Sequence, residues 1–262
     1  MSTERLIAHK TGPVGWLIFN NPARRNALSV DMWEGMAPVL DGYADDPEVR
    51  VVVLKGAGDK AFVAGADISQ FENQRASKEA VAHYDEMSKR ALGALQRIGK
   101  PTIAMIRGFC IGGGLNVAMS CDLRIAAADA RLAIPAAKLG LGYAYDGVKK
   151  LVSLVGPAYA KEIYFTGRQF DAAEAHQMGL LNRVVPVEAL ESTIETLTAT
   201  IADNAPLTVK STKLSVDVSV SDDPSKRLAE VEAAVAACFA SQDYIEGRRA
   251  FMEKRKPKFR GV

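Results

Sequence analysis

Residues 100–120, KPTIAMIRGFCIGGGLNVAMS, constrain the fold more than any other part of the chain. Pro101 cannot donate to a strand ladder and suits the start of a strand, and residues 102–106 have the length of a buried parallel strand. Gly112, Gly113 and Gly114 then precede a segment of helix-compatible composition at residues 115–119. A strand, a glycine turn and a helix leave free backbone N–H groups at the helix N-terminus, and glycine lets another group approach them closely.

Three interpretations of these glycines compete. The first is a tight turn that lets helix and strand pack closely. The second is a dinucleotide-binding turn, which is disfavoured because Val117 stands where a third glycine is wanted. A P-loop is excluded because no Gly-Lys-Ser/Thr follows. The third is an oxyanion hole, in which backbone donors meet negative charge that develops during a reaction, and it requires a second such turn.

A second glycine-bordered turn lies at residues 61–68, AFVAGADI. It follows the apolar run VRVVVL at residues 49–54, which has the composition of a buried parallel strand. Gly65, with the small Ala64 and Ala66 on either side, again permits close backbone approach. Two such turns, each after a buried strand, favour the oxyanion interpretation over an ordinary strand-to-loop junction.

Composition narrows the class of protein. A chain of 262 residues with 48% apolar and 24% charged residues can form one large domain or two small ones. The net charge of +2 gives no reason to expect a nucleic-acid partner. Three widely spaced cysteines without a C-x-x-C pair indicate a reducing compartment and no metal site or disulfide. The N-terminus lacks an apolar leader and no run reaches about 18 apolar residues, so we expect a cytoplasmic protein without a membrane partner.

The order of local signals predicts an α/β core followed by a helical region. Ser29 is expected to begin a helix as its N-cap, and Pro38 to kink or shorten that helix. Residues 78–97 carry an apolar stripe typical of a long core helix, and Asp171 with Glu174 forms a capping-box pattern. Further strands are expected at residues 6–8, 16–19, 122–126, 131–134 and 180–185.

From residue 187 onward the pattern is purely helical. We therefore expect a core at residues 1–200 and a C-terminal helical region at residues 201–262 that packs on a partner subunit.

The chain resembles the crotonase superfamily, the enoyl-CoA hydratase/isomerase family, from about residue 7 to residue 260. The resemblance is carried by NPARRNALS, AFVAGADI, PTIAMIRGFCIGGGLNVAMSCD, FTGRQFDAAEA with MGLLNRVVP, and YIEGRRAFMEKRKPKF. It implies a spiral of ββα turns with C-terminal helices that form a homotrimer or a dimer of trimers. It also implies a coenzyme A thioester as substrate, with no permanently bound cofactor.

The same resemblance assigns roles to residues. The oxyanion donors are the backbone N–H groups of Ala66 and Gly113, which hold the thioester oxygen as an enolate forms. The coenzyme A portion is expected against two loops and the basic C-terminal segment, where the alternative for Lys254 is a solvated basic tail. The residues expected to bind it are Arg24, Arg25, Ala27, Ala64, Asp67, Ile68 and Lys254.

Two positions depart from the family pattern. Hydratases of the family use two glutamates to activate water, and this chain has Asn116 and Ala136 at those positions. Neither side chain can take up a proton at neutral pH, so hydration by two glutamates is not expected. Asp146 is a candidate replacement base, with N-cap of the following helix (residues 147–155) as its alternative role. Tyr143 or Tyr145 is a candidate hydrogen-bond donor.

Several reactions therefore stay open. An enzyme that stabilises a thioester enolate can be a hydratase, an isomerase or a decarboxylase. Tyr143 and the segment AFMEKRKP resemble the methylmalonyl-CoA decarboxylase branch, although that branch has a histidine where this chain has Ala66. A non-catalytic acyl-CoA-binding protein is a further alternative, and a dinucleotide-dependent reductase is a distant third. His9, His83 and His176 fall outside the site motifs and are expected to have surface or packing roles.

Overall fold

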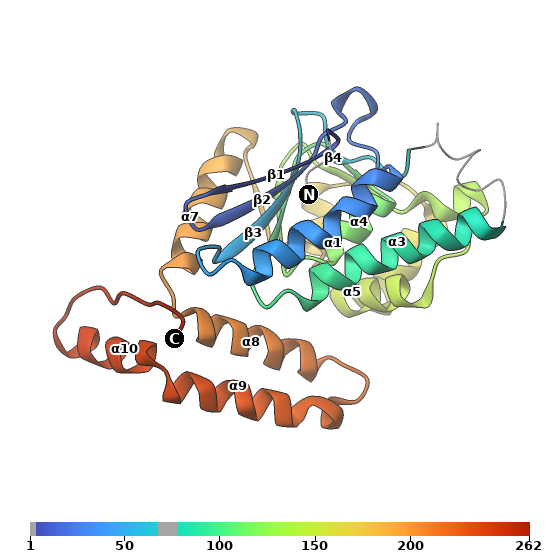
Figure 1. Cartoon of the computed structure of the whole chain (residues 1–262). Coiled ribbons are helices and arrows are strands. Elements are labelled where there is room, and N and C mark those ends of the chain that lie inside the picture. Colours follow the sequence, from blue (N-terminus) through green and yellow to red (C-terminus); the bar gives the residue numbers. More distant parts are fainter. Residues whose placement is uncertain (1–3, 68–77) are drawn as a thin grey trace.

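The structure, a computed structural model, describes residues 4–67 and 78–262, without the side chains of residues 78–81. Within this part of the chain, two β-sheets and the helices around them form the α/β core of a crotonase fold (Figure 1). The larger sheet has the strand order β1-β2-β3-β5-β7-β10 and the smaller one β4-β6-β8-β9. The strands are β1 Leu6–Thr11, β2 Val14–Phe19, β3 Val51–Gly56, β4 Ala61–Val63, β5 Thr102–Ile106, β6 Phe109–Ile111, β7 Leu123–Ala127, β8 Arg131–Ala133, β9 Phe170–Asp171 and β10 Arg183–Val185.

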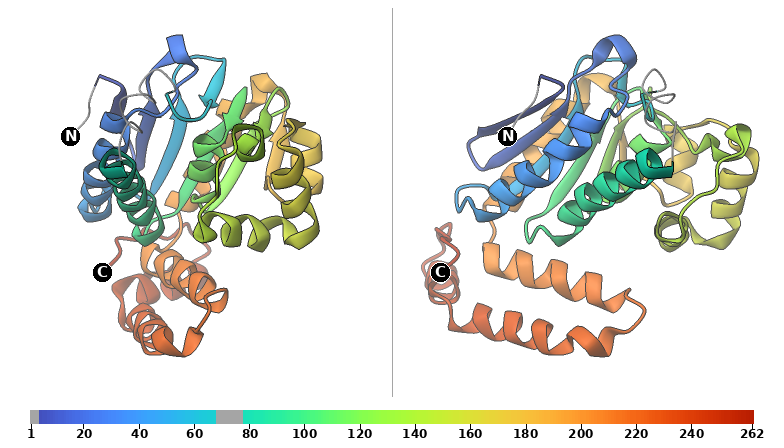
Figure 2. Two further views of the ribbon diagram at one scale, coloured as in Figure 1. Left: turned by 90° about the vertical axis from the view of Figure 1, so that its right-hand side faces the viewer. Right: turned by 45° about the vertical axis from the view of Figure 1, so that its right-hand side comes forward.

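The larger sheet is parallel except for the hairpin of β1 and β2 at one edge. β3 and β5 are its central strands, and their apolar side chains are buried on both faces, as expected for parallel strands covered by helices. One face packs with α1 (Val30–Asp45) and α3 (Lys78–Arg97), and the other face with α7 (Leu190–Ala202). Figures 1 and 2 show α1 and α3 side by side along this sheet.

The smaller sheet positions the two glycine turns. β4, β6 and β8 are parallel, and β9 closes the edge in antiparallel orientation. β6 leads through Gly112 into α4 (Gly113–Met119). α5 (Tyr145–Thr166) follows the short 3-10 helix Pro135–Leu139 and breaks at Gly156, which has φ 72° and ψ 168°.

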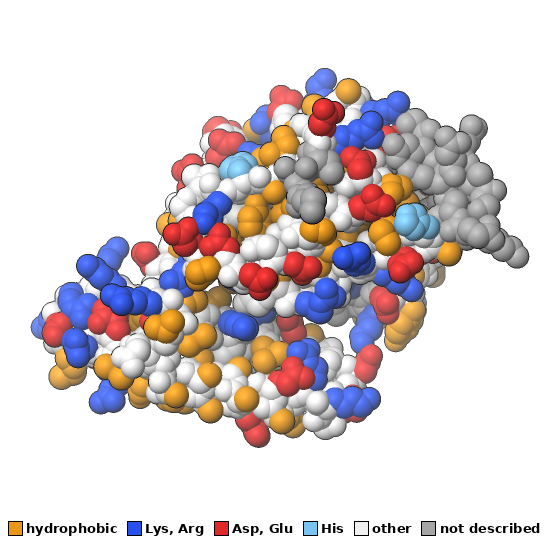
Figure 3. Space-filling model, viewed as in Figure 1, with side chains coloured by type: hydrophobic (Ala, Val, Ile, Leu, Met, Phe, Trp, Pro, Cys, Tyr) orange, Lys and Arg blue, Asp and Glu red, His pale blue; other side chains and the backbone are white. Residues whose placement is uncertain are grey.

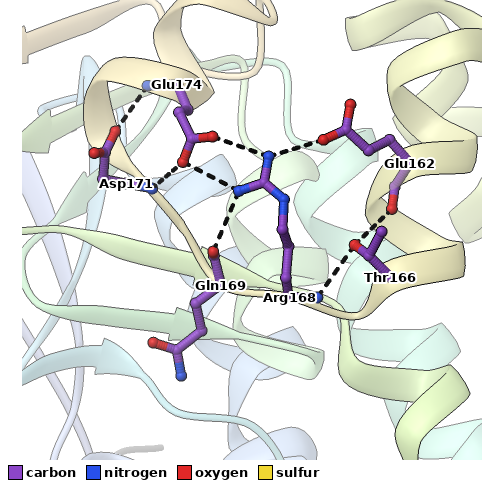
Figure 4. Close-up of polar contacts among 6 residues, drawn as sticks. All are labelled: Glu162, Thr166, Arg168, Gln169, Asp171 and Glu174. Atoms are coloured by element: carbon purple, nitrogen blue, oxygen red, sulfur yellow. Dashed lines mark hydrogen bonds and ion pairs between the residues drawn. The ribbon is translucent and has the colours of Figure 1, made fainter.

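A network of charged groups joins the end of α5 to α6 (Ala172–Gln177) (Figure 4). The guanidinium of Arg168 contacts the carboxylates of Glu162 at 2.8 Å and Glu174 at 2.9 Å. The Asp171 carboxylate accepts from the backbone N–H of Glu174, and the Glu174 side chain accepts from the backbone N–H of Asp171, so the predicted capping box is present. The hydrogen bonds that Arg168 donates to Glu174 raise the pKa of Arg168 and lower the pKa of Glu174, as in a mutually stabilised ion pair.

The C-terminal helices α8 (Pro206–Ser219), α9 (Leu228–Ala240) and α10 (Gln242–Met252) lie together beneath the core (Figures 1 and 2). Ser241 caps α10 through its hydroxyl, which accepts from the backbone N–H of Tyr244. Lys213 of α8 contacts the Asp122 carboxylate at 2.8 Å and so ties this helix to the core. Among the described residues, none of the helices is both long and apolar enough to cross a membrane.

Two local predictions were wrong. α1 continues through Pro38 to Asp45 without ending or breaking there, because Pro38 lies on the exposed face of the helix, where the freed carbonyl of Glu34 can reach water. Asp146 is not the N-cap of the helix that begins after the tyrosine loop: Ala144 is the N-cap and Asp146 is the second helical residue. The three-residue strand β6, between β5 and the glycines, was not predicted.

Candidate functional site

The two glycine-bordered turns leave the same edge of the smaller sheet. Val63 of β4 and Cys110 of β6 are paired in parallel register. Ala66 lies three residues beyond Val63, and Gly113 lies three residues beyond Cys110. A Cβ placed on Gly65 would lie 3.7 Å from the carbonyl oxygen of Ile111, so the two turns are in contact. The structure therefore brings together the two turns that the sequence analysis paired.

The backbone N–H groups of Ala66 and Gly113 are available to a ligand. Leu28 pairs with Ala66 through bonds from its own N–H to the Gly65 carbonyl (2.8 Å) and from the Asp67 N–H to its carbonyl (2.9 Å). In parallel pairing, the residue between those two directs its N–H to the other side. Gly113 is the first residue of α4, where the N–H has no partner within the helix. Within the described ranges, no acceptor engages either N–H.

A different structural constraint acts at each glycine of the triplet. Gly112, the residue before α4, has φ 54° and ψ −114°, a conformation that residues with a Cβ rarely adopt. A Cβ on Gly114 would lie 2.2 Å from the carbonyl oxygen of Val63, so α4 can pack on β4 only without one. A Cβ on Gly113 would lie 3.3 Å from Cδ1 of Leu28. Gly114 thus allows close packing, whereas Gly113 presents an N–H group.

The loop at residues 24–27 and the turn at residues 64–67, both expected to bind coenzyme A, contact each other. The Ala64 N–H donates to the Arg25 carbonyl (3.0 Å), and the Arg24 guanidinium contacts the buried Asp67 carboxylate at 3.1 Å. The Arg25 guanidinium lies over the Phe109 ring at 4.7 Å from its centroid. Ala27 is buried beside this pair of segments. Ile68, which was expected to belong to the same set, lies outside the described residues.

Asn26 holds the 24–27 loop in place, a role that was not predicted. Its fully buried side chain donates to the carbonyls of Ala57 (2.9 Å) and Ala61 (2.8 Å) and accepts from the N–H of Asn21 (3.0 Å). Its φ of 57° is in the left-handed region, which asparagine tolerates better than most residues. That tolerance was the available sequence signal. The hydrogen-bond partners of the side chain, which lie far away in the sequence, could not be read from it.

Asn116 and Tyr143 both lie next to Gly147 of α5. A Cβ on Gly147 would lie 2.8 Å from Cε1 of Tyr143 and 4.0 Å from Oδ1 of Asn116. Burial, and then the neighbouring Tyr84, raises the pKa of Tyr143 to about 12, so its phenol stays protonated at neutral pH. On its other side the Tyr143 ring packs on Tyr164, with centroids 5.0 Å apart. Near Asn116 the site therefore offers a phenol and an amide, and neither acts as a base at pH 7.

The remaining predicted residues are more dispersed. Ala136 is buried in the 3-10 helix before α5, and Asp146 is exposed in the first turn of α5. Lys254 is exposed just after α10, with φ 53°. Because α10 and β4 lie at opposite ends of the molecule (Figure 1), one chain does not bring Lys254 to the two turns.

A cavity of about 840 Å³ lies elsewhere, between α8, α9 and α10, and none of the residues that line it belongs to the two turns. In the part of the chain that the structure describes, no group of three His, Cys, Asp or Glu residues could hold a metal ion.

Comparison with known proteins gives full-length matches. The family model "Enoyl-CoA hydratase/isomerase" matches residues 10–262. A short-chain-enoyl-CoA hydratase of Clostridium acetobutylicum is 36% identical over 256 residues, which cover 98% of this chain and 97% of that protein. A crotonyl-CoA hydratase of Syntrophomonas wolfei is 34% identical, with 99% of both chains covered. The crystal structure of an enoyl-CoA hydratase from Bacillus anthracis superposes with a TM-score of 0.93 at 32% identity, covering 98% of this chain and 100% of that one.

Proposed function

The chain belongs to the enoyl-CoA hydratase/isomerase family and is an enzyme of that family, and we propose that it binds an acyl-CoA thioester whose carbonyl oxygen accepts from the backbone N–H groups of Ala66 and Gly113. The observation that carries the proposal is the pair of N–H groups left without an internal acceptor, among the residues described, at adjacent strand ends. As the thioester becomes an enolate, negative charge develops on that oxygen. Preorganised backbone donors stabilise such charge without an ionisable group that could compete for protons.

We propose that coenzyme A lies against the two contacting segments at residues 24–27 and 64–67. The Arg24 and Arg25 guanidinium groups supply positive charge at that surface, and small Ala27 and Ala64 leave room for close approach. The ion pair of Arg24 with Asp67 fixes the spacing of the two segments. This arrangement supports a phosphate-bearing ligand whose thioester end reaches Ala66.

The reaction that follows enolate stabilisation depends on the groups around the acyl chain. Asn116 and Ala136 cannot supply the acid and base of hydration. Asp146 is exposed in the first turn of α5, four residues before Lys150, and it is our candidate base for removal of a Cα proton. Decarboxylation is the second candidate, because loss of a carboxylate forms the enolate without a base and the protonated Tyr143 phenol can donate to that carboxylate.

Replacement of one N–H group tests the oxyanion role. Gly113→Pro removes the N–H at the first position of α4, where proline fits a helix. Gly113→Ala is the matched control, because it adds the same Cβ contact with Leu28 and retains the N–H. We expect turnover by the proline variant to fall about 100- to 1,000-fold below that of the alanine variant. Equal turnover by the two variants would refute the proposed site.

A panel of thioesters separates the candidate reactions. The panel consists of crotonyl-CoA, butanoyl-CoA in deuterated solvent and a malonyl-type CoA, followed by absorbance, deuterium uptake at Cα and release of carbon dioxide. Uptake of deuterium identifies a base-assisted enolisation. Carbon dioxide release without uptake from butanoyl-CoA identifies a decarboxylase. Rapid hydration of crotonyl-CoA would contradict the argument from Asn116 and Ala136.

The C-terminal helices support assembly into a homotrimer or a dimer of trimers. Large apolar side chains are exposed along them, and Figure 3 shows hydrophobic side chains gathered over this part of the surface. Phe251 is 82% and Phe239 is 63% exposed. Both line the 840 Å³ cavity between the helices, and apolar surface of this extent is typical of an interface between subunits.

A further inference from the structure

Lys150 of α5 lies at the end of α4 opposite Gly113. Its ammonium donates to the Ser120 hydroxyl at 2.6 Å. The Ser120 hydroxyl in turn donates to the backbone carbonyl of Asn116 at 2.7 Å. A chain of two hydrogen bonds therefore runs from Lys150 to the residue that stands in place of a catalytic glutamate.

The two helices run in the same direction past each other. Gly147 of α5 lies beside Asn116 of α4, and one turn further along Lys150 lies beside Ser120. The helices thus advance together from the end where Gly113 presents its N–H group. The Lys150 bond is the polar contact that fixes this register, because Gly147 itself has no side chain to hold Asn116.

Lys150 is not explained by an ion pair. Across the described residues, no carboxylate lies within ion-pairing distance of its ammonium. The charged and titratable groups that act on it are Cys121 after α4, Asp146 on α5 and Arg124 on β7. Burial lowers the pKa of Lys150 to about 8, and Arg124 adds to this while Cys121 and Asp146 oppose it. The ammonium is therefore charged at pH 7 and becomes neutral in mildly alkaline solution.

We propose that Lys150 is a positioning residue. Its ammonium acts through Ser120 on the Asn116 carbonyl and so holds α4 in place. The Gly113 N–H and the Asn116 amide thereby keep their orientation toward the acyl thioester. A cation at the C-terminal end of a helix also interacts favourably with the helix dipole. This inference rests on the proposed function, because the group being positioned is the oxyanion donor.

The infrared stretching frequency of the bound thioester carbonyl measures that positioning. Butanoyl-CoA labelled with carbon-13 at the carbonyl is bound to the full-length protein between pH 6.5 and 9.5, and the downshift on binding reports hydrogen bonding in the oxyanion hole. We expect a downshift in the wild type below pH 8 that is at least halved in Lys150→Met. Above pH 8 the downshift in the wild type is expected to fall toward that of Lys150→Met. Lys150→Arg is expected to keep the wild-type downshift from pH 6.5 to 9.5.

Two further variants test whether the effect of Lys150→Met comes from its contact with Ser120. Lys149→Met is the matched control, because the neighbouring Lys149 is exposed and pairs with Asp222 of another element; its carbonyl frequency is expected to equal that of wild type. Ser120→Ala removes the intermediate hydroxyl while keeping the ammonium, and it is expected to reproduce the effect of Lys150→Met on the carbonyl frequency. Turnover of Lys150→Met and of Ser120→Ala is expected to fall at least about tenfold, within the range that a misplaced catalytic group costs, whereas Lys149→Met is expected to keep wild-type turnover.

The outcomes separate this inference from the proposed function. A wild-type downshift that neither Lys150→Met nor Ser120→Ala reduces would overturn the positioning role and leave the oxyanion site intact. An equal reduction in Lys149→Met would also overturn it. Absence of any downshift in the wild type and in Gly113→Ala would refute the oxyanion site itself, and the positioning role with it.

Discussion

Replacement of Lys150 by methionine is expected to make the protein more stable at neutral pH. Methionine has a similar length and fills the space of the lysine stem with apolar atoms. The buried ammonium has its pKa lowered from 10.5 to about 8, chiefly by burial, which means that folding disfavours its charged form. Removing the charge removes this penalty.

The magnitude follows from the two pKa values. At 1.36 kcal/mol for each pKa unit, a pKa of about 8 in place of 10.5 corresponds to about 3 kcal/mol of unfavourable free energy at pH 7. The variant also loses the hydrogen bond that the Lys150 ammonium donates to Ser120, and a bond from a charged group contributes about 1.5–3 kcal/mol. We expect a net increase of about 1 kcal/mol in the free energy of unfolding of Lys150→Met at pH 7.

The pH dependence has a definite sign. Below pH 8 the amine is protonated in both the folded and the unfolded chain, so the full penalty is present in the wild type. Between pH 8 and 10.5 the unfolded chain binds more protons than the folded one, and wild-type stability rises relative to the variant. Above pH 10.5 both states are neutral and the advantage of Lys150→Met disappears.

Urea unfolding of wild type, Lys150→Met and Lys149→Met at pH 7 and at pH 10 measures these differences. Lys149 is an exposed lysine whose pKa is raised by its hydrogen bond to Asp222, so its removal is not expected to stabilise the protein. Lower stability of Lys150→Met at pH 7, with a difference that does not change with pH, would refute the reasoning and identify Lys150 as an ordinary structural contact. Higher stability combined with lower turnover is the result that a purely structural role cannot produce.

Three further predictions concern other parts of the molecule. Gly114→Ala places a Cβ against the Val63 carbonyl and is expected to lower the free energy of unfolding by about 1–3 kcal/mol, measured from the urea midpoint. Phe251→Asp places a charge on the exposed apolar surface of α10 and is expected to reduce the sedimenting mass of the assembly to that of one chain; an unchanged mass would exclude this surface as the interface. Asp146→Asn is expected to abolish deuterium exchange at Cα of butanoyl-CoA, and exchange at the wild-type rate would remove Asp146 as the base.

The sequence predicted elements accurately where the signal was local. The bounds of β5 and α3, and the capping box of Asp171 and Glu174, follow from apolar runs, helical periodicity and cap chemistry within a few residues. β6 was missed because its three residues lie directly before the glycine triplet and carry no local signal that separates them from that turn. The course of α1 past Pro38 was mispredicted because it depends on which face of the helix meets water.

The residues of the site also differ in whether a local sequence signal predicts them. The two turns were identified from Gly65 and Gly113 with their preceding strands, because glycine and small residues at strand ends are visible in sequence. The contacts of Lys150 with Ser120 and of Asn26 with Ala61 join segments 30 or more residues apart and depend on how the two sheets stack. Such contacts have no signature within either segment alone. The residues that orient the site are accordingly harder to predict than the residues that present its donors.

The protonation states around the acyl site constrain the chemistry more than the fold does. An enolate can be formed by removing a proton or by losing a carboxylate, and hydration additionally needs an acid and a base close to the double bond. Here the side chains of Asn116 and Ala136 have no group that acts as an acid or a base at pH 7, and Tyr143, with its pKa raised to about 12, remains a donor. Among the described residues, the charged group that contacts this region through Ser120 is the Lys150 ammonium, and a positive charge favours developing negative charge and opposes binding of a proton nearby. We propose that such surroundings stabilise an enolate once it has formed and provide little help in delivering water to carbon, and for this reason we place enolisation and decarboxylation ahead of hydration for this member of the family.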